Sequence, residues 1–95
     1  MITRIVRLCF KKECVAHFLK EFHSSKEAIA SFEGCRELHL MRDADEENIY
    51  FTLSKWDSVE ALNRYRNSEL FKSTWSKVKP FFEASPLAFS LEETS

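Results

Sequence analysis

The most informative stretch of this chain is Ile49-Tyr50-Phe51-Thr52-Leu53-Ser54-Lys55-Trp56. Its β-branched and aromatic residues favour a strand, in which successive side chains point to opposite faces of the sheet. The odd positions from Ile49 to Leu53 therefore form an apolar face, and the even positions from Tyr50 to Trp56 form a semi-polar one. Most antiparallel strands bury one face and leave the other in water. This pattern instead predicts a sheet between its own helices and a second molecule, with a pocket on one side.

The flanking segments complete the predicted order of elements, because a period of two indicates a strand and a period of 3.6 a helix. Strands are expected over residues 2–10, 35–42, 49–56 and 87–91, and helices over 13–32, 58–67 and 68–82. Gly34 is expected to end the first helix, and Pro80 to weaken the last turn of the third. Asp57, with Glu60 three residues later, predicts a capping box before the second helix, and Ser68 can cap the third.

The order β-α-β-β-α-α-β predicts an α+β fold of the ferredoxin-like sandwich type, with helices on one face of a four-stranded sheet. The other face would then expose several large apolar side chains, and such patches commonly mark interfaces. The sequence therefore predicts an obligate homodimer that packs sheet to sheet. The alternative is that the open face is merely patchy.

Size and composition limit the function classes. The 95 residues predict one domain, 1–95, and the nine Phe, two Trp and two Tyr can supply a dense core, a small-molecule pocket, or both. Fourteen Lys and Arg against fifteen Asp and Glu give a net charge of −1, which argues against nucleic acid as a partner. No apolar run reaches the ~18 residues that a membrane span needs, so no membrane partner is expected.

The cysteines and the N-terminal segment bear on cellular location. Cys9, Cys14 and Cys35 match no CxxC spacing, which indicates reduced thiols in a cytoplasmic protein and no disulfide or metal site. Arg4 and Arg7 interrupt the apolar N-terminal stretch, which does not fit a secretory signal. These two arginines could equally form cross-strand ion pairs.

The chain resembles the antibiotic biosynthesis monooxygenase (ABM) superfamily over nearly its whole length, residues 2–91. The resemblance rests on three segments: Phe32-Glu33-Gly34-Cys35, Phe51-Thr52-Leu53-Ser54-Lys55-Trp56-Asp57-Ser58 and Tyr65-Arg66-Asn67-Ser68-Glu69-Leu70-Phe71. Members are dimeric α+β barrels, and they include cofactor-independent oxygenases of aromatic polyketides, quinol monooxygenases, haem-degrading enzymes and proteins with no known reaction. The resemblance implies a cofactor-independent monooxygenase that oxidises a small phenol- or hydroquinone-type aromatic with O2.

The resemblance also implies catalytic positions. Trp56 matches a tryptophan that the polyketide oxygenases carry at the end of strand three, but Thr52 stands where those enzymes have an asparagine. Tyr65 stands where many simpler members carry a histidine; it can keep a hydrogen-bonding role but titrates at a much higher pH. His39, the only histidine on a predicted strand, is the candidate base because an imidazole pKa lies near neutrality. Trp56, Tyr65 and His39 are therefore the predicted catalytic residues.

The predicted substrate-binding residues are aromatic and polar side chains that suit a planar ring: Tyr50, Thr52, Phe71, Trp75 and Arg66. Arg66 would neutralise an anionic substrate. Purely structural interpretations stay open beside these roles, since Trp75 shares an apolar helical stripe with Phe71, and His39 can face an interface instead of a pocket.

Two further functions stay open. A non-catalytic dimeric barrel that binds a small molecule, as a sensor or carrier, would share the fold without turnover. Haem binding or degradation is the third possibility. That branch of the family uses an asparagine on strand one, a tryptophan in the short helix and a histidine in the next helix, whereas this chain offers Tyr65 and Trp75 at the two helical positions and no evident axial ligand.

Overall fold

The computed structural model describes residues 1–94, and this part of the chain forms four strands and three α-helices. The strands are β1 (Ile2–Cys9), β2 (Cys35–Arg42), β3 (Ile49–Trp56) and β4 (Leu87–Glu92). The α-helices are α1 (Val15–Ala30), α2 (Val59–Arg66) and α3 (Glu69–Val78), with short 3-10 turns η1 (Lys12–Cys14) before α1 and η2 (Lys79–Phe81) after α3. This order confirms the predicted β-α-β-β-α-α-β arrangement and the ferredoxin-like α+β class.

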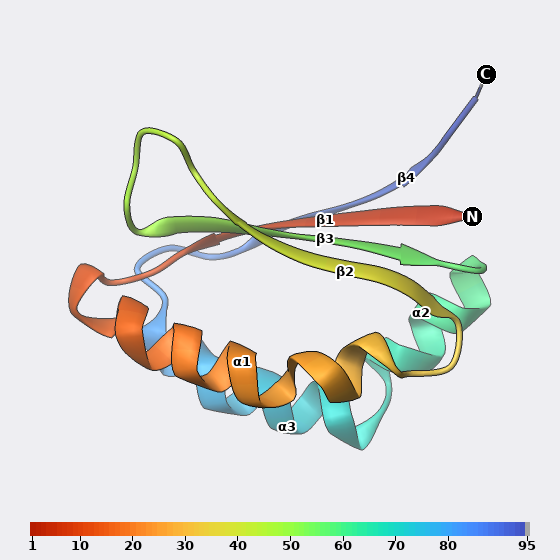
Figure 1. The fold of residues 1–95 in the computed structure, drawn as a ribbon, viewed down its shortest axis with the longest axis horizontal. Coiled ribbons are helices and arrows are strands. Elements are labelled where there is room, and N and C mark those ends of the chain that lie inside the picture. The colour runs from red at the N-terminus through yellow and green to blue at the C-terminus, as the bar shows by residue number, and fades with distance from the viewer. Residues whose placement is uncertain (95) are drawn as a thin grey trace.

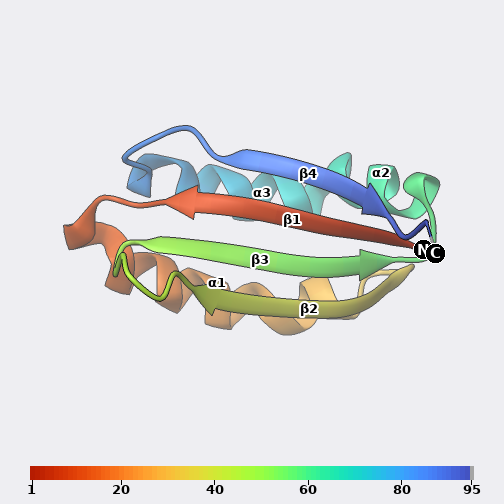
Figure 2. The same ribbon diagram turned by 90° about the horizontal axis from the view of Figure 1, so that it is seen from above.

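The four strands form one antiparallel sheet in the order β2-β3-β1-β4, with β1 and β3 at its centre. All three α-helices lie on the same side of this sheet (Figure 1). Seen from the sheet side, α1 lies behind β2 and β3, whereas α2 and α3 lie behind β1 and β4 (Figure 2). Within residues 1–94 no helix is long and apolar enough to cross a membrane.

The start of α2 differs from the predicted capping box. The cap is Ser58, whose hydroxyl accepts a hydrogen bond from the Ala61 backbone N–H at 3.1 Å. Asp57 cannot take this role because the Arg36 guanidinium binds both of its carboxylate oxygens, with Nη2 at 3.1 Å from Oδ2. Ser68 does cap α3, as predicted, by accepting from the Phe71 N–H at 3.1 Å.

Helix α3 is shorter than predicted because it ends at Val78 rather than near Phe82. Pro80 has no backbone N–H and closes the helix into the 3-10 turn η2. The chain then extends, and Phe82 forms an isolated antiparallel bridge with Phe10 and stacks on its ring at 5.0 Å.

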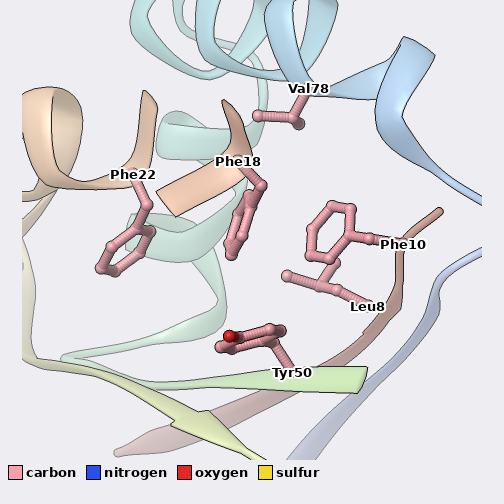
Figure 3. Close-up of a cluster of buried hydrophobic side chains, with 6 residues drawn as sticks. All are labelled: Leu8, Phe10, Phe18, Phe22, Tyr50 and Val78. Carbon is pink, nitrogen blue, oxygen red and sulfur yellow. The ribbon is translucent and has the colours of Figure 1, made fainter. Parts of the chain in front are cut away.

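The core lies between the sheet and the helices in two clusters. One contains Leu8, Phe10, Phe18, Phe22, Tyr50 and Val78, whose side chains converge from β1, the residue that follows it, β3, α1 and α3 (Figure 3). The other contains Ile2, Trp56, Ala61 and Leu62, at the end of the sheet that α2 covers. Burying one such aliphatic or aromatic side chain contributes about 1.5–3 kcal/mol, so these clusters hold the helices on the sheet.

The sheet face away from the helices carries the large apolar side chains that the alternation predicts. The most exposed of them are Leu87, Phe89, Leu91 and Met41, at 50%, 53%, 48% and 46% exposure. Across the strands, Phe89 pairs with Ile5, and Ile5 pairs with Leu53, which makes a continuous apolar row. A patch of this kind is typical of an interface.

Candidate functional site

A cavity of about 420 Å³ lies between the helix-facing side of the sheet and the helices. All four strands and all three α-helices contribute side chains to its wall. Its volume falls within the range of small-molecule sites in proteins. The cavity is therefore the candidate functional site.

A row of aromatic rings forms one wall of the cavity. Trp56, at the end of β3, stacks on Tyr65 of α2 with ring centroids 4.9 Å apart and planes inclined by 22°. Tyr65 meets Phe71 of α3 edge-on at 5.2 Å, and Phe71 stacks parallel to Trp75 at 5.9 Å. Because these rings come from three different elements that pack together, they form a rigid apolar wall that suits a planar ring.

The orientation of Trp56 is held by a hydrogen bond inside the site. Its indole Nε1 donates to the Ser54 hydroxyl at 3.0 Å, and the residue is only 1% exposed. Ser54 and Thr52 lie on the same strand face and also line the cavity. Their hydroxyls supply polar groups to an otherwise largely apolar wall.

Burial controls the protonation of the tyrosine in this wall. Burial, together with the nearby Cys35, raises the pKa of Tyr65 to about 12. Near neutral pH its hydroxyl therefore stays protonated, so Tyr65 is a hydrogen-bond donor and not a base.

This shift gives a prediction for stability at high pH. Tyr65 has a pKa of 10.0 when unperturbed and about 12 in the fold, so the native state binds more protons than the unfolded state between these values. The Tyr65 contribution to stability is complete below pH 10 and is lost as the pH rises towards about 12. Urea unfolding of wild type and Tyr65→Phe across this range should show a shallower decline for the variant. Identical slopes would contradict the assignment.

Most of the predicted site residues meet at this cavity. The predicted site residues that line it, together with other side chains, are Trp56, Tyr65, Thr52, Phe71, Trp75 and Arg66. The alternation of β3 placed Thr52 and Trp56 on one strand face, and the helical spacing placed Phe71 and Trp75 on one side of α3, but their meeting at the cavity depends on tertiary packing.

Tyr50 does not line the cavity, unlike the other predicted substrate-binding residues. It belongs to the core cluster shown in Figure 3, where its ring centroid lies 5.7 Å from that of Phe18 and 6.2 Å from that of Phe10. Its cross-strand partner Leu8 and its neighbour Phe18 do line the cavity, so Tyr50 lies next to the wall without forming part of it. The even positions of β3 therefore lie on one face of the strand, but Tyr50 is packed in the core whereas Thr52, Ser54 and Trp56 line the cavity.

His39 lies on the opposite face of the sheet, which does not fit a base for chemistry in the cavity. It pairs with Leu53, whose side chain points away from the helices, and its Nε2 lies 3.0 Å from Oε1 of Glu37. The neighbouring Leu38 and Leu40 instead pack against the core. The alternation of β2 thus places His39 on the proposed interface side.

Arg4 and Ser54 line the cavity but were missed as site residues. The sequence signal for Arg4 was its position between Ile2 and Val6 on the same, helix-facing side of β1. Its partner is not an acid, as a cross-strand ion pair would require: Nη1 donates to the Ser90 hydroxyl of β4 at 2.8 Å.

The thiols are dispersed over the fold. Cys9, Cys14 and Cys35 are free and partly buried. Within residues 1–94, no group of three His, Cys, Asp or Glu side chains is placed to hold a metal ion.

Comparison with known proteins identifies the family. The sequence model of the antibiotic biosynthesis monooxygenase family matches residues 1–76. The chain belongs to this family. The match includes Trp56 and Tyr65 and confirms the resemblance found in the sequence. No curated protein matches the sequence significantly.

Solved structures share the fold of this ABM protein. A Caulobacter crescentus protein, proposed to be an antibiotic biosynthesis monooxygenase, has a TM-score of 0.91 and 24% identity over 99% of this chain and 90% of that protein. A second structure, described as an antibiotic biosynthesis monooxygenase, has a TM-score of 0.93 and 15% identity over the full length of both chains. A conserved Methanosarcina mazei protein has a TM-score of 0.92 and 19% identity, with 99% of this chain and 94% of that protein covered. At these identities the likeness establishes the fold.

Proposed function

We propose that this ABM protein is a cofactor-independent monooxygenase that oxidises a small phenol- or hydroquinone-type aromatic with O2. The observation that supports this most directly is the stacked pair of Trp56 and Tyr65 in the wall of the 420 Å³ cavity. A flat aromatic substrate can pack against this wall, and its largely apolar side chains limit the contact of water with a reactive intermediate.

The proposed reaction needs few protein groups. The ionised substrate passes one electron to O2, the resulting radicals combine into a ring hydroperoxide, and loss of water leaves a quinone. In this scheme one oxygen atom enters the ring and the other leaves as water. Tyr65, which keeps its proton because its pKa is raised to about 12, donates a hydrogen bond to the substrate oxygen. Trp56, Phe71 and Trp75 orient the ring, and Thr52 supplies a hydroxyl.

We also propose that two copies pack through the open sheet face, as in the α+β barrels of the family. The apolar row of Phe89, Ile5 and Leu53 supports this arrangement. Such a dimer would place the two cavities on its outer sides, because each lies between the sheet and the helices.

Oxygen uptake with a hydroquinone panel tests the catalytic proposal. We expect turnover by wild type, and a reduction of about 10- to 100-fold in kcat/KM for Tyr65→Phe, the effect of losing one hydrogen bond to a charged group. Tyr50→Phe is the matched control, since it removes the same hydroxyl from a tyrosine outside the cavity, and it should keep wild-type activity. Equal kcat/KM values for wild type and Tyr65→Phe would refute the role of Tyr65.

The second candidate is a non-catalytic protein that binds a small aromatic molecule. One observation favours it: within the part of the chain that the structure describes, no His, Asp or Glu that could act as a base lines the cavity. This candidate predicts tight binding of an aromatic ligand, measured by quenching of tryptophan fluorescence, and no oxygen uptake with any member of the panel.

A further inference from the structure

The cavity has an unbalanced charge. Arg4 of β1 and Arg66, the last residue of α2, are the charged side chains among the residues that line it. Among the described residues, no Asp, Glu, Lys or His lines the wall. An apolar cavity whose charges are all positive favours an occupant that carries negative charge.

Neither guanidinium has an ion-pair partner among residues 1–94. Among residues 1–94, the ion pairs join Arg36 to Asp57 and join Glu37 to His39 and to Lys55. Arg4 is partly buried and donates from Nη1 to the neutral hydroxyl of Ser90. A partly buried cation without an acidic partner, such as Arg4, carries a desolvation cost that a bound anion would offset.

The two arginines also lie close enough to repel each other. Burial, and next to it the charge of Arg66, lower the pKa of Arg4. A guanidinium stays protonated even so, and therefore both side chains remain cationic near neutral pH. An anion between them would remove this repulsion while accepting hydrogen bonds from both.

From this geometry we infer that the cavity selects planar aromatic ligands that carry an anionic oxygen group, with the anion on Arg4 and Arg66 and the ring against Trp56 and Tyr65. The inference deepens the proposed function and rests on it in taking this ligand to be the substrate. It bears on the missing base only where the anion is a phenolate, because a phenol that is already ionised needs no proton acceptor in the wall.

The charge requirement is tested with matched ligands on wild-type protein. Calorimetric titration with 2,5-dihydroxybenzoate and 2,5-dihydroxybenzamide compares a carboxylate with a neutral amide on the same hydroquinone ring. We expect the acid to bind at least about 10-fold more tightly, the effect of one charge-assisted hydrogen bond. Added salt should weaken the binding of the acid more than the binding of the amide, because salt screens charge interactions.

A second pair asks whether an ionised phenol serves as well as a carboxylate. The ligand 4-nitrophenol, titrated below and above its own pKa, is compared with 4-nitroanisole, which cannot ionise. If 4-nitrophenol binds more tightly once it is ionised, the cavity accepts a phenolate as the anion. If only 2,5-dihydroxybenzoate binds more tightly than its neutral counterpart, the cavity selects a carboxylate. No gain with either anion overturns the inference.

Substitutions locate the anion. Arg66→Gln and Arg4→Gln should each weaken binding of the preferred anion by about 10- to 100-fold. Neither substitution should change the affinity for 2,5-dihydroxybenzamide appreciably. Arg64→Gln is the matched control, because Arg64 lies on the same helix, is exposed and does not line the cavity. Arg66 is exposed, so its variant tests the inference even where Arg4→Gln impairs folding. Unchanged affinity of Arg66→Gln for the anion overturns it.

Oxygen uptake by the same compounds separates this inference from the proposed function. Arginine-dependent binding of the anion without oxygen uptake supports the charge selection and refutes the oxygenase. Equal kcat/KM for the acid and the amide, unaffected by both arginine substitutions, supports the oxygenase and refutes the charge selection.

Discussion

Gly34→Ala is expected to destabilise the protein by about 2–5 kcal/mol, the sum of backbone strain and overpacking. Gly34 adopts a φ of +91°, a conformation that a side chain with a Cβ rarely takes. A Cβ at this position would also lie 2.5 Å from the Cβ of Ala61, which is itself 1% exposed. The turn therefore admits no side chain, and α2 would have to move to make room. Urea unfolding at neutral pH measures the loss.

Ala61→Gly separates the two causes. In the double variant the contact between the two Cβ atoms is gone, whereas the unfavourable φ remains. We expect Ala61→Gly alone to cost about 1 kcal/mol through helix propensity, and the double variant to be more stable than the sum of the single effects predicts. Strict additivity, or a loss below about 0.5 kcal/mol for Gly34→Ala, would contradict the packing described here. Because α2 carries Tyr65 and Arg66, Gly34→Ala should also weaken ligand binding in the cavity.

Phe89→Asp is expected to convert the proposed dimer into monomers. Phe89 is 53% exposed in the single chain, so the fold should tolerate the change, but its row with Ile5 and Leu53 would be buried between two sheets. An uncompensated buried charge costs about 3–5 kcal/mol, and a two-fold interface contains it twice. We therefore expect the dimer Kd to rise at least about 1,000-fold. Light scattering after gel filtration at micromolar concentration reports the mass.

Val59→Asp is the matched control for the interface. It also places a carboxylate at a half-exposed apolar residue, with an exposure of 45%, but at the first turn of α2 and away from the sheet face. A negative charge is favourable at the N-terminus of a helix. This variant should remain dimeric. The proposed interface would be ruled out by a Phe89→Asp protein with the mass of wild type, or by a wild type that is monomeric at micromolar concentration.

The sequence was most informative where a property depends on near neighbours. The alternation of residues 49–56 placed Trp56 and Thr52 on one face, and the spacing of Phe71 and Trp75 placed both on one side of α3. Gly34 marked a turn because its positive φ is a local requirement. The capping box was wrong because Asp57 takes its partner from Arg36, 21 residues away, which local spacing does not reveal.

Sequence alone therefore determined the order of the elements, the two faces of each strand and the family, because side-chain direction in a strand or helix follows from the local backbone. Only the tertiary structure decided which face meets the cavity and what lies opposite each residue. It placed His39 outside, Tyr50 in the core and Arg4 beside Ser90, at the charged cavity wall that includes Arg66. These outcomes depend on strand register and helix packing between segments distant in sequence, for which the pattern of one segment contains no information.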